Sequence, residues 1–331
     1  MSHYTAVVPV AGAGTRLKPH TYTYPKVLLT VGDKPILGHI VDKLLNCGIK
    51  DICFVIGYLG EKVKDYIERE YGRKVRAFFV TQKEQKGLGH AVWLTRRCVK
   101  GPLLIILGDT IIDADIKDFL DLKIARLGVR EVSDPRRFGI VEVSDDNFIV
   151  DMVEKPENPK TNLAISGIYS FPDSKKLYSA LDEIIKSGIK TKNEYQLTDA
   201  MRLMVKRGYK MLAVKINGWY DCGKSETLLE TNTYILSSKR LSCKIKGSVI
   251  IAPSYISPSA RIKSSIIGPY VSIGDNARVE NSIVSSSIVN EGAVIKNLNL
   301  SNSIIGPNAV LEGNSYSFNV GENSGIKIVE K

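Results

Sequence analysis

The stretch from Val7 to Lys26 reads VVPVAGAGTRLKPHTYTYPK. An apolar run passes into a glycine-rich turn, which is followed by one arginine and a Pro-Lys pair. The run is typical of a buried strand, and a glycine turn after a strand leaves backbone N–H groups free to bind phosphate. Arg16 and Lys26 place two cations near this turn, which favours stabilisation of a reacting phosphoryl group. A tight turn beside a surface arginine is the alternative that this stretch alone leaves open.

The turn differs from two common phosphate-binding motifs. It is not a Walker A loop, because no Gly-Lys-Ser or Gly-Lys-Thr follows at the required spacing. It is a poor dinucleotide fingerprint, because Leu17 stands at the third glycine position and no acidic residue closes a second strand where one is expected. The turn therefore predicts a phosphate site outside both classes.

Around this turn, apolar runs alternate with amphipathic stretches. The pattern predicts strands over residues 5–10, 51–57, 75–80 and 102–109, and helices over residues 36–48, 59–72, 87–99 and 193–208. Such alternation indicates a doubly wound, mostly parallel sheet, which becomes mixed after Ile140 where the runs look like hairpins. Because ligands bind at the carboxyl ends of parallel strands, we expect the Gly12 turn and Asp109 at the same edge.

The pattern changes near Ser238. Beyond it, apolar residues recur at six-residue steps with some five-residue steps between them, and SIIGPYVSIGDN and SIIGPNAVLEGN are close copies. A short fixed period predicts a β-helix of stacked coils, about three of them if each has three six-residue turns. An irregular β-sandwich is the alternative. We therefore expect two domains, residues 1–238 and 239–331.

The composition of the chain limits the classes of partner that it is expected to bind. The 331 residues carry a formal charge of +11, from 46 Lys and Arg against 35 Asp and Glu. The cations are spread along the chain without a nucleic-acid motif, so we expect a small polyanionic substrate and no nucleic acid. The absence of a signal-peptide pattern and of a bilayer-length apolar run predicts a cytoplasmic protein without membrane contact. The five cysteines form no CxxC pair, which argues against structural zinc and a disulfide framework.

The stretch and seven later motifs together resemble the sugar-1-phosphate nucleotidylyltransferases, also called sugar-nucleotide pyrophosphorylases, over almost the whole chain. The family's G-x-G-T-R-L…P-K signature is matched by Gly12 to Leu17 and by Pro25-Lys26. The later motifs follow in order: TQKEQKGLGHAV, LGDT, RFGIVEV, VEKP, ISGIY, NEYQLTD and GWYDCGK. The match is closest to the long glucose-1-phosphate thymidylyltransferases. It implies a Rossmann-like nucleotidyltransferase core followed by a left-handed β-helix.

The resemblance also implies a reaction: Mg²⁺-dependent transfer of a nucleotidyl group from dTTP or UTP to glucose-1-phosphate. The products would be pyrophosphate and a nucleotide sugar for cell-surface polysaccharide synthesis. A UTP- or GTP-using enzyme for another hexose-1-phosphate, or a catalytically silent regulatory paralogue, are the alternatives. The implied roles are catalysis for Arg16, Lys26 and Lys155; nucleotide binding for Ala11, Gly12, Ala13, Gly14, Thr15, Gln82, Gly87 and Gly108; sugar binding for Gly139, Glu154, Lys155, Ser166, Gly167, Glu194 and Trp219; and Mg²⁺ binding for Asp109 and Asp221.

Some residues depart from this pattern or lie outside it. Thr110, Ser166 and Cys222 stand where many relatives have Asn, Asn and Thr. We expect Cys222 to be a plain substitution rather than a redox switch, and His90, on a helical apolar face, to be structural. The histidines all precede the repeats, so we expect no acyltransferase activity there, since such enzymes normally use a catalytic histidine. A homo-oligomer, with the repeats in an oligomerisation or regulatory role, is the expectation instead.

Overall fold

The computed structural model describes residues 4–239 and 243–314. Contacts between Cα atoms divide the chain into two compact units, Met1–Tyr234 and Ile235–Lys331. The division falls inside helix α6 (Ser225–Lys239), and the domain boundary at residue 238 stays a prediction. Throughout the described ranges, every helix is too short or too polar to span a bilayer.

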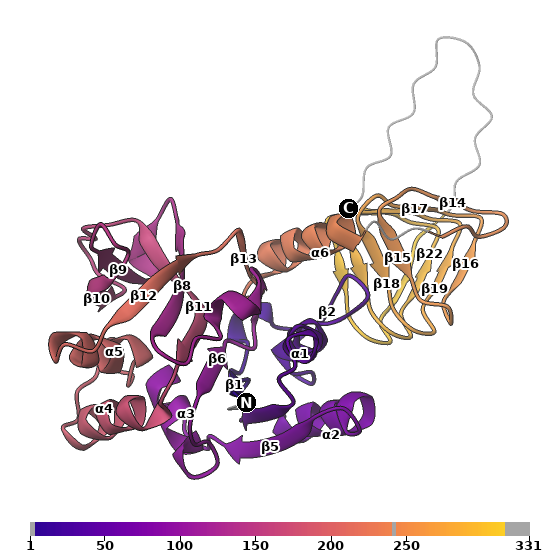
Figure 1. The fold of residues 1–331 in the computed structure, drawn as a ribbon. Coiled ribbons are helices and arrows are strands. Elements are labelled where there is room, and N and C mark those ends of the chain that lie inside the picture. Colours follow the sequence, from indigo (N-terminus) through magenta and orange to yellow (C-terminus); the bar gives the residue numbers. More distant parts are fainter. Residues whose placement is uncertain (1–3, 240–242, 315–331) are drawn as a thin grey trace, which may run out of the picture. The chain divides into compact units, whose positions relative to one another are not determined.

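A nine-stranded mixed sheet forms the centre of the first unit (Figure 1). Its parallel half places four strands side by side in the order β5 (Arg76–Thr81), β4 (Asp51–Ile56), β1 (Thr5–Pro9) and β6 (Leu103–Ile106). The next strand, β11 (Leu163–Phe171), runs antiparallel to β6. The remaining strands are β8 (Ala125–Glu131), β9 (Gly139–Val143), β10 (Ile149–Glu154) and β12 (Met211–Lys215). The predicted mixed α/β core is confirmed.

Four predicted helices are present, with one displaced boundary. α1 (Ile36–Asn46), which follows the hairpin β2 (Thr30–Val31) and β3 (Lys34–Pro35), α2 (Gly60–Tyr71) and α3 (Leu88–Leu94) lie inside their predicted ranges. α5 (Leu197–Lys206) begins four residues later than the expected start at Asn193. Lys192 and Asn193 have φ of 52° and 66°, a left-handed conformation that a right-handed helix excludes.

Two helices, α4 (Ser174–Lys186) and α6, are not predicted by the sequence analysis. α4 nevertheless carries a start signal, because the Asp173 carboxylate accepts a hydrogen bond of 3.0 Å from the Lys175 N–H. Its apolar face, which includes Leu177 and Leu181, joins α3 and α5 in one core with the sheet. This core holds the strands whose ends form the site.

The carboxyl ends of β1 and β6 meet at one edge of the sheet, as predicted for the Gly12 turn and Asp109. The Gly108 N–H donates to the Pro9 carbonyl (3.2 Å) and ties the two segments together. A small sheet extends this edge: β7 (Thr110–Asp113) pairs antiparallel with β13 (Gly218–Asp221), and Thr110 lies opposite Asp221. Segments distant in sequence thus come together beside the turn.

The second unit is a left-handed β-helix, in which each coil contributes one short strand to each of three parallel sheets (Figure 1). The first sheet contains β14 (Val249–Ile250), β17 (Ile266–Ile267), β20 (Ile283–Ser285) and β23 (Asn299–Ser301). The second contains β15 (Ser254–Ile256), β18 (Val271–Ile273), β21 (Ile288–Val289) and β24 (Ile304–Ile305). The third contains β16 (Arg261–Lys263), β19 (Arg278–Glu280), β22 (Val294–Lys296) and β25 (Val310–Glu312).

The expectation of about three coils is wrong, because each sheet has four strands. Val249 pairs with Ile266, 17 residues later, and Ile283 pairs with Asn299, 16 residues later. The five-residue steps therefore lie within the coils and shorten each one below the roughly 18 residues of three hexapeptide turns.

Polar residues at the corners explain the abundance of asparagine and serine in this unit. Asn281 and Asn297 occupy equivalent corners with φ of 49° and 53°, a conformation that asparagine tolerates better than most residues. Beside them, the Ser265 hydroxyl accepts from the Ser282 N–H (3.1 Å), and the Ser282 hydroxyl accepts from the Leu298 N–H (3.1 Å). These ladders satisfy backbone groups where the strands end, while isoleucine and valine side chains fill the interior.

Candidate active site

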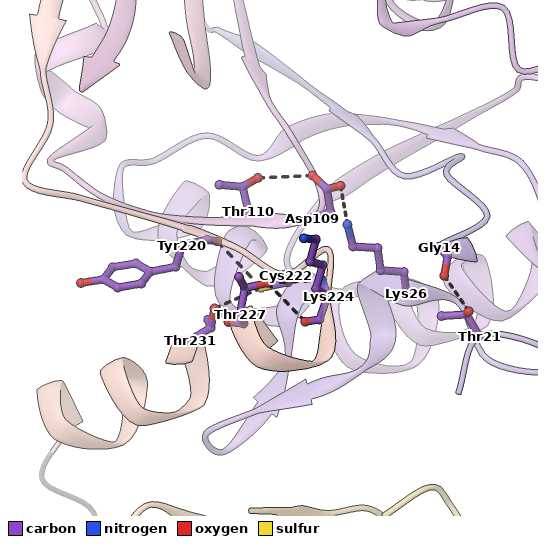
Figure 2. A network of polar contacts seen from close by, with 10 residues as sticks. All are labelled: Gly14, Thr21, Lys26, Asp109, Thr110, Tyr220, Cys222, Lys224, Thr227 and Thr231. Atoms are coloured by element: carbon purple, nitrogen blue, oxygen red, sulfur yellow. Dashed lines mark hydrogen bonds and ion pairs between the residues drawn. The ribbon is translucent and has the colours of Figure 1, made fainter. Parts of the chain in front are cut away.

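The glycine turn follows β1 directly. Its two glycines, Gly12 and Gly14, lack a side chain for different structural reasons. A Cβ atom at Gly12 would meet no heavy atom within 4 Å, so this exposed position leaves open space for a ligand. Gly14 has φ +62°, and a Cβ there would approach side-chain carbons of Lys26 and Thr21 at 3.0 Å each. The Thr21 hydroxyl donates to the Gly14 carbonyl (2.8 Å; Figure 2) and fixes the turn. Glycine at position 14 thus allows the turn to lie against Lys26.

Lys26, at the start of a 3₁₀ turn (Lys26–Leu28), forms an ion pair with Asp109 after β6 (Figure 2). The distance from Nζ to Oδ2 is 2.7 Å; the Lys26 side chain is 7% exposed and that of Asp109 is 41% exposed. Desolvation raises the pKa of Asp109, but the Lys26 ammonium and the Thr110 hydroxyl (3.3 Å from Oδ1) outweigh it and hold the pKa below its ordinary value. Asp109 is therefore a carboxylate at neutral pH.

Asp221 lies next to Asp109, because the Cys222 N–H donates to the Asp109 carbonyl oxygen (3.1 Å) and β13 pairs with β7. A Cβ atom at Gly223 would lie 2.9 Å from Arg16 Nη2 and 2.9 Å from both carboxylate oxygens of Asp221. Gly223 is thus the gap across which Arg16, on the 3₁₀ turn Thr15–Leu17, faces Asp221. The two predicted metal ligands and both predicted phosphate cations, Arg16 and Lys26, meet at this sheet edge.

The carboxylates fit a hard divalent cation that also binds substrate. Within residues 4–239 and 243–314 there is no group of three or more His, Cys, Asp or Glu that could hold a metal by itself. Two carboxylates on neighbouring segments, one of them lining the cleft, match the usual way in which Mg²⁺ is bound, by one or two carboxylates together with phosphate oxygens and water. Asp109 and Asp221 are the residues that could hold such an ion.

A cleft of about 280 Å³ lies at the same edge. Its volume is close to the lower end of ligand pockets, about 300 Å³. It brings together members of three predicted groups that are distant in sequence: those for the nucleotide, the reacting phosphate and the sugar. The lining residues are Pro9, Val10, Ala11, Gly12, Lys26, Val27, Gln82, Gln85, Gly87, Leu88, Ala91, Leu107, Asp109 and Glu194.

The loop that carries the predicted nucleotide-binding residues Gln82 and Gly87 forms one wall of the cleft. Gln82, which directly follows β5, is 6% exposed, and its Nε2 donates to the Gly87 carbonyl (3.1 Å). The same Nε2 lies 3.2 Å from Nδ1 of His90 on α3. Gly87 has φ +102°, and a Cβ there would collide with the Tyr195 carbonyl and the Glu194 side chain. The loop therefore packs closely on the segment that precedes α5.

The predicted sugar residues separate into two groups. Glu154, at the end of β10, accepts a hydrogen bond of 2.7 Å from the Thr198 hydroxyl on α5, and Gly139 lies against both side chains. Lys155 follows with φ +42° and lines a second hollow, of about 620 Å³. That hollow is also lined by Arg136, Arg137, Pro156, Glu157 and Lys192. Thr198 and Lys192 are not among the residues predicted from the sequence, although Thr198 lies within the NEYQLTD motif and Lys192 directly precedes it.

Three other predicted residues lie outside the cleft lining. Ser166 is 0% exposed, so its side chain does not reach a ligand directly, and its Oγ has no hydrogen-bond partner among the described residues. Gly167 has φ +87° and packs on Leu107, which does line the cleft. Trp219 packs edge-to-face on Phe138 with ring centroids 4.6 Å apart, and its indole N–H is buried without a partner in the described part of the chain.

The side chain of Cys222 is buried in the protein interior. Burial raises the pKa of its thiol to about 12, and Sγ lies 3.6 Å from the Thr231 hydroxyl (Figure 2). A buried, protonated thiol is a poor nucleophile and reacts slowly with oxidants. This agrees with the expectation of a plain substitution.

Comparison with known proteins gives a consistent set of relatives. Residues 5–238 match the family described as "Nucleotidyl transferase". The chain is 37% identical over 245 residues to the bifunctional protein GlmU of Methanocaldococcus jannaschii, a match covering 74% of this chain and 57% of GlmU. It is 34% identical over 229 residues to the UTP–glucose-1-phosphate uridylyltransferase AglF of Haloferax volcanii, covering 67% and 92% of the two chains. A solved structure, UDP-glucose pyrophosphorylase complexed with UDP-glucose, has a TM-score of 0.63 at 26% identity and covers 72% of this chain and 100% of that one. The match to GlmU spans less than two thirds of that relative's length.

Proposed function

Because the chain belongs to the nucleotidyl transferase family, we propose that it transfers a nucleotidyl group from dTTP or UTP to glucose-1-phosphate and releases pyrophosphate. The observation that carries the proposal is one cleft in which the Gly12 turn, the Lys26–Asp109 pair and Gln82 all take part. The similarity to AglF, a UTP–glucose-1-phosphate uridylyltransferase, and to a solved UDP-glucose complex supports a uridine nucleotide and a hexose.

In the proposed reaction, an oxygen of the sugar phosphate attacks the α-phosphorus of the triphosphate. The new P–O bond forms while the bond from the α-phosphorus to the bridging oxygen of pyrophosphate breaks. Both reactants are anions, so catalysis depends on positioning and charge neutralisation rather than on a protein nucleophile. Arg16 and Lys26 supply fixed positive charge at the triphosphate, and Lys155 holds the sugar phosphate.

We propose that Asp109 and Asp221 hold Mg²⁺. Their carboxylates are the ligand type that Mg²⁺ prefers, and the open space beside Gly12 admits the phosphates that complete its coordination. When bound, the ion neutralises charge on the phosphate oxygens. Glu154, Gly139 and Glu194 are the proposed contacts of the hexose, with Thr198 holding the Glu154 carboxylate in place.

The test is pyrophosphate release with glucose-1-phosphate, Mg²⁺ and each of dTTP, UTP, GTP, CTP and ATP. We expect release with UTP, dTTP or both. The same panel with other hexose-1-phosphates separates the glucose enzyme from one for another sugar. Absence of release across all combinations would leave the silent regulatory paralogue as the better account, although the residues proposed for charge and metal, Arg16, Lys26, Asp109 and Asp221, are all in place.

For the β-helix we propose a role in self-association. Val249, Ile266 and Ile283 lie opposite one another on successive coils, and all three side chains are exposed. An outward apolar row of this kind is a typical site for protein contact. Light scattering of the wild type and of an Ile266→Asp, Ile283→Asp double variant tests this: we expect an oligomer that dissociates in the variant, and a monomeric wild type would contradict the proposal.

A further inference from the structure

The carboxamide of Gln82 is held by two acceptors. Its Nε2 donates to the Gly87 carbonyl oxygen at 3.1 Å and lies 3.2 Å from His90 Nδ1. A carbonyl oxygen only accepts hydrogen bonds, so the amide nitrogen, and not the amide oxygen, must face Gly87. One N–H is then directed at Gly87 and the other at the ring nitrogen of His90.

The contact with Gln82 also determines the tautomer of His90. Nδ1 can accept from the Gln82 N–H only when it carries no proton, so the proton of the neutral ring is on Nε2. The ring is kept in place by stacking on Trp93, with centroids 5.8 Å apart. Burial and the Lys86 cation lower the pKa of His90, and Glu84 opposes them, so the neutral ring prevails at neutral pH.

The remaining polar atom of the carboxamide is its oxygen. Gln82 lines the cleft, and no hydrogen bond within residues 4–239 and 243–314 uses Oε1. With both amide hydrogens engaged by Gly87 and His90, Gln82 presents an acceptor, and no donor, to a ligand in the cleft.

We propose that His90 is a positioning residue for base selection: it orients the Gln82 carboxamide so that the cleft takes bases with a ring N–H donor and rejects those with a ring nitrogen acceptor. Uracil and thymine carry such a donor at N3, and guanine carries one at N1. Cytosine and adenine carry a lone pair at the equivalent edge, which would face Oε1 without a hydrogen bond. This inference rests on the proposed function and adds His90 as the residue that orients the nucleotide-binding Gln82.

The isosteric pair His90→Leu and His90→Asn tests the inference. Asparagine can place its side-chain oxygen near the Nδ1 position and keep an acceptor for Gln82, whereas leucine fills the space without one. The measured quantity is the ratio of kcat/KM for UTP to that for CTP. A site built to hydrogen-bond its substrate discriminates strongly, so we expect a wild-type ratio of at least about 100. In His90→Leu the ratio should fall by about tenfold, and in His90→Asn it should stay within about threefold of wild type.

The pH dependence of this ratio gives a second readout. When His90 is protonated, Nδ1 becomes a donor that opposes the Gln82 N–H and favours a rotated amide. The pKa of His90 is lowered from 6.5. The wild-type ratio should therefore be constant at neutral pH and fall only below pH 6.5, while the ratio of His90→Asn should show no such fall. The other charged groups that act on the ring are Lys86, Glu84 and Arg96. Ionisation of the triphosphate is common to UTP and CTP and cancels in the ratio.

The outcomes separate this inference from the proposed function. A wild type that releases pyrophosphate with UTP or dTTP, combined with an unchanged ratio in folded His90→Leu, overturns the role of His90 alone. A wild type that prefers CTP overturns the orientation of Gln82 and leaves the transferase activity standing. A wild type inactive with every triphosphate defeats the proposed function itself.

Discussion

The two sides of the candidate active site differ in how far they are organised without a ligand. On the nucleotide side, Lys26 and Gln82 are almost fully buried, and each is fixed by contacts within one cleft. On the sugar side, Lys155 lines an open hollow beside other exposed cations, and the Trp219 indole N–H has no partner among the described residues. Lys26 and Gln82 are thus held by buried contacts, whereas Lys155 on the sugar side lies near the surface and only Glu154, which Thr198 contacts, is held in a comparable way.

This difference has an energetic meaning. Groups that are already placed lose little freedom when they meet a transition state, so their contribution appears mainly in kcat. Groups that become ordered on binding lose part of their interaction energy to that ordering, and their removal weakens binding more than turnover. Substitutions on the two sides should therefore separate kcat from KM.

The largest effect is expected for Arg16→Ala. Arg16 Nη2 lies where it faces Asp221 across Gly223, and loss of one group that stabilises developing charge costs about 10²–10³ in kcat. Steady-state pyrophosphate release measures this, with Arg69→Ala as control, since Arg69 is exposed, forms an ion pair with its neighbour Glu70 and lies over the Tyr66 ring, all on helix α2. Activity of Arg16→Ala near that of the control would remove Arg16 from the catalytic set.

A smaller loss is expected for Asp221→Asn, which keeps the shape of the side chain and removes its charge. If Asp221 and Asp109 share Mg²⁺, the Mg²⁺ concentration that gives half-maximal rate should rise by about tenfold or more, because each carboxylate contributes charge to a hard-cation site. Titration of the rate with Mg²⁺ is the measurement. An unchanged titration curve would show that Asp221 is not a ligand.

On the sugar side, Thr198→Val tests whether Thr198 holds the Glu154 carboxylate in position. Thr198→Val removes a hydroxyl that donates to the Glu154 carboxylate at 2.7 Å. A hydrogen bond to a charged group contributes about 1.5–3 kcal/mol at most, and less where the carboxylate can reach water, so KM for the sugar phosphate should rise by about three- to tenfold. Here kcat should change less than KM. A loss confined to kcat would contradict the division between the two sides.

The contrast between the two sides also explains how much of the site the sequence predicted. Gly12 and Asp109 follow the apolar strands β1 and β6, and such positions can be predicted because parallel strands end at one edge. Gly223 and Thr198 carry no chemical signal of their own; only the folded chain brings them against Arg16, Asp221 and Glu154. The sequence alone therefore predicts charged residues at strand ends better than the neutral residues that hold them in place.

How well the fold can be predicted also depends on the spacing at which apolar residues recur in the sequence. The six-residue step predicts the β-helix, but a uniform six-residue turn predicts too few coils, because five-residue steps shorten each coil. α4 is absent from the sequence-based prediction, although Asp173 caps it and Leu177, Leu181 and Ile184 recur at helical spacing.

A modest change in stability is expected for Asp109→Asn. Because the pKa of Asp109 is lowered in the folded state, the stabilisation from its pair with Lys26 is fully present above the ordinary value of 3.8 and is lost as pH falls through the lower folded value. The partial exposure of Asp109 limits the effect to about 1 kcal/mol. Urea unfolding of wild type and variant at several pH values measures the effect. The difference in their free energies of unfolding should be constant at neutral pH and disappear only in acid. If this difference instead varied around pH 7, a group other than Asp109 would be responsible.

The smallest effect is expected for Ser166→Ala. The sequence placed Ser166 at the sugar, but its side chain is fully buried and its hydroxyl has no partner in the described residues. Removing an unsatisfied buried hydroxyl is close to neutral, so the free energy of unfolding should change by less than about 1 kcal/mol, and KM for the sugar phosphate should stay within about twofold of wild type. Ser170→Ala is the matched control, since Ser170 is also buried with an unpartnered hydroxyl on the same strand. A rise in KM for Ser166→Ala without one for Ser170→Ala would mean that β11 moves when sugar binds and brings this hydroxyl to the ligand. The sugar side would then be organised by the substrate, whereas the nucleotide side is organised in its absence.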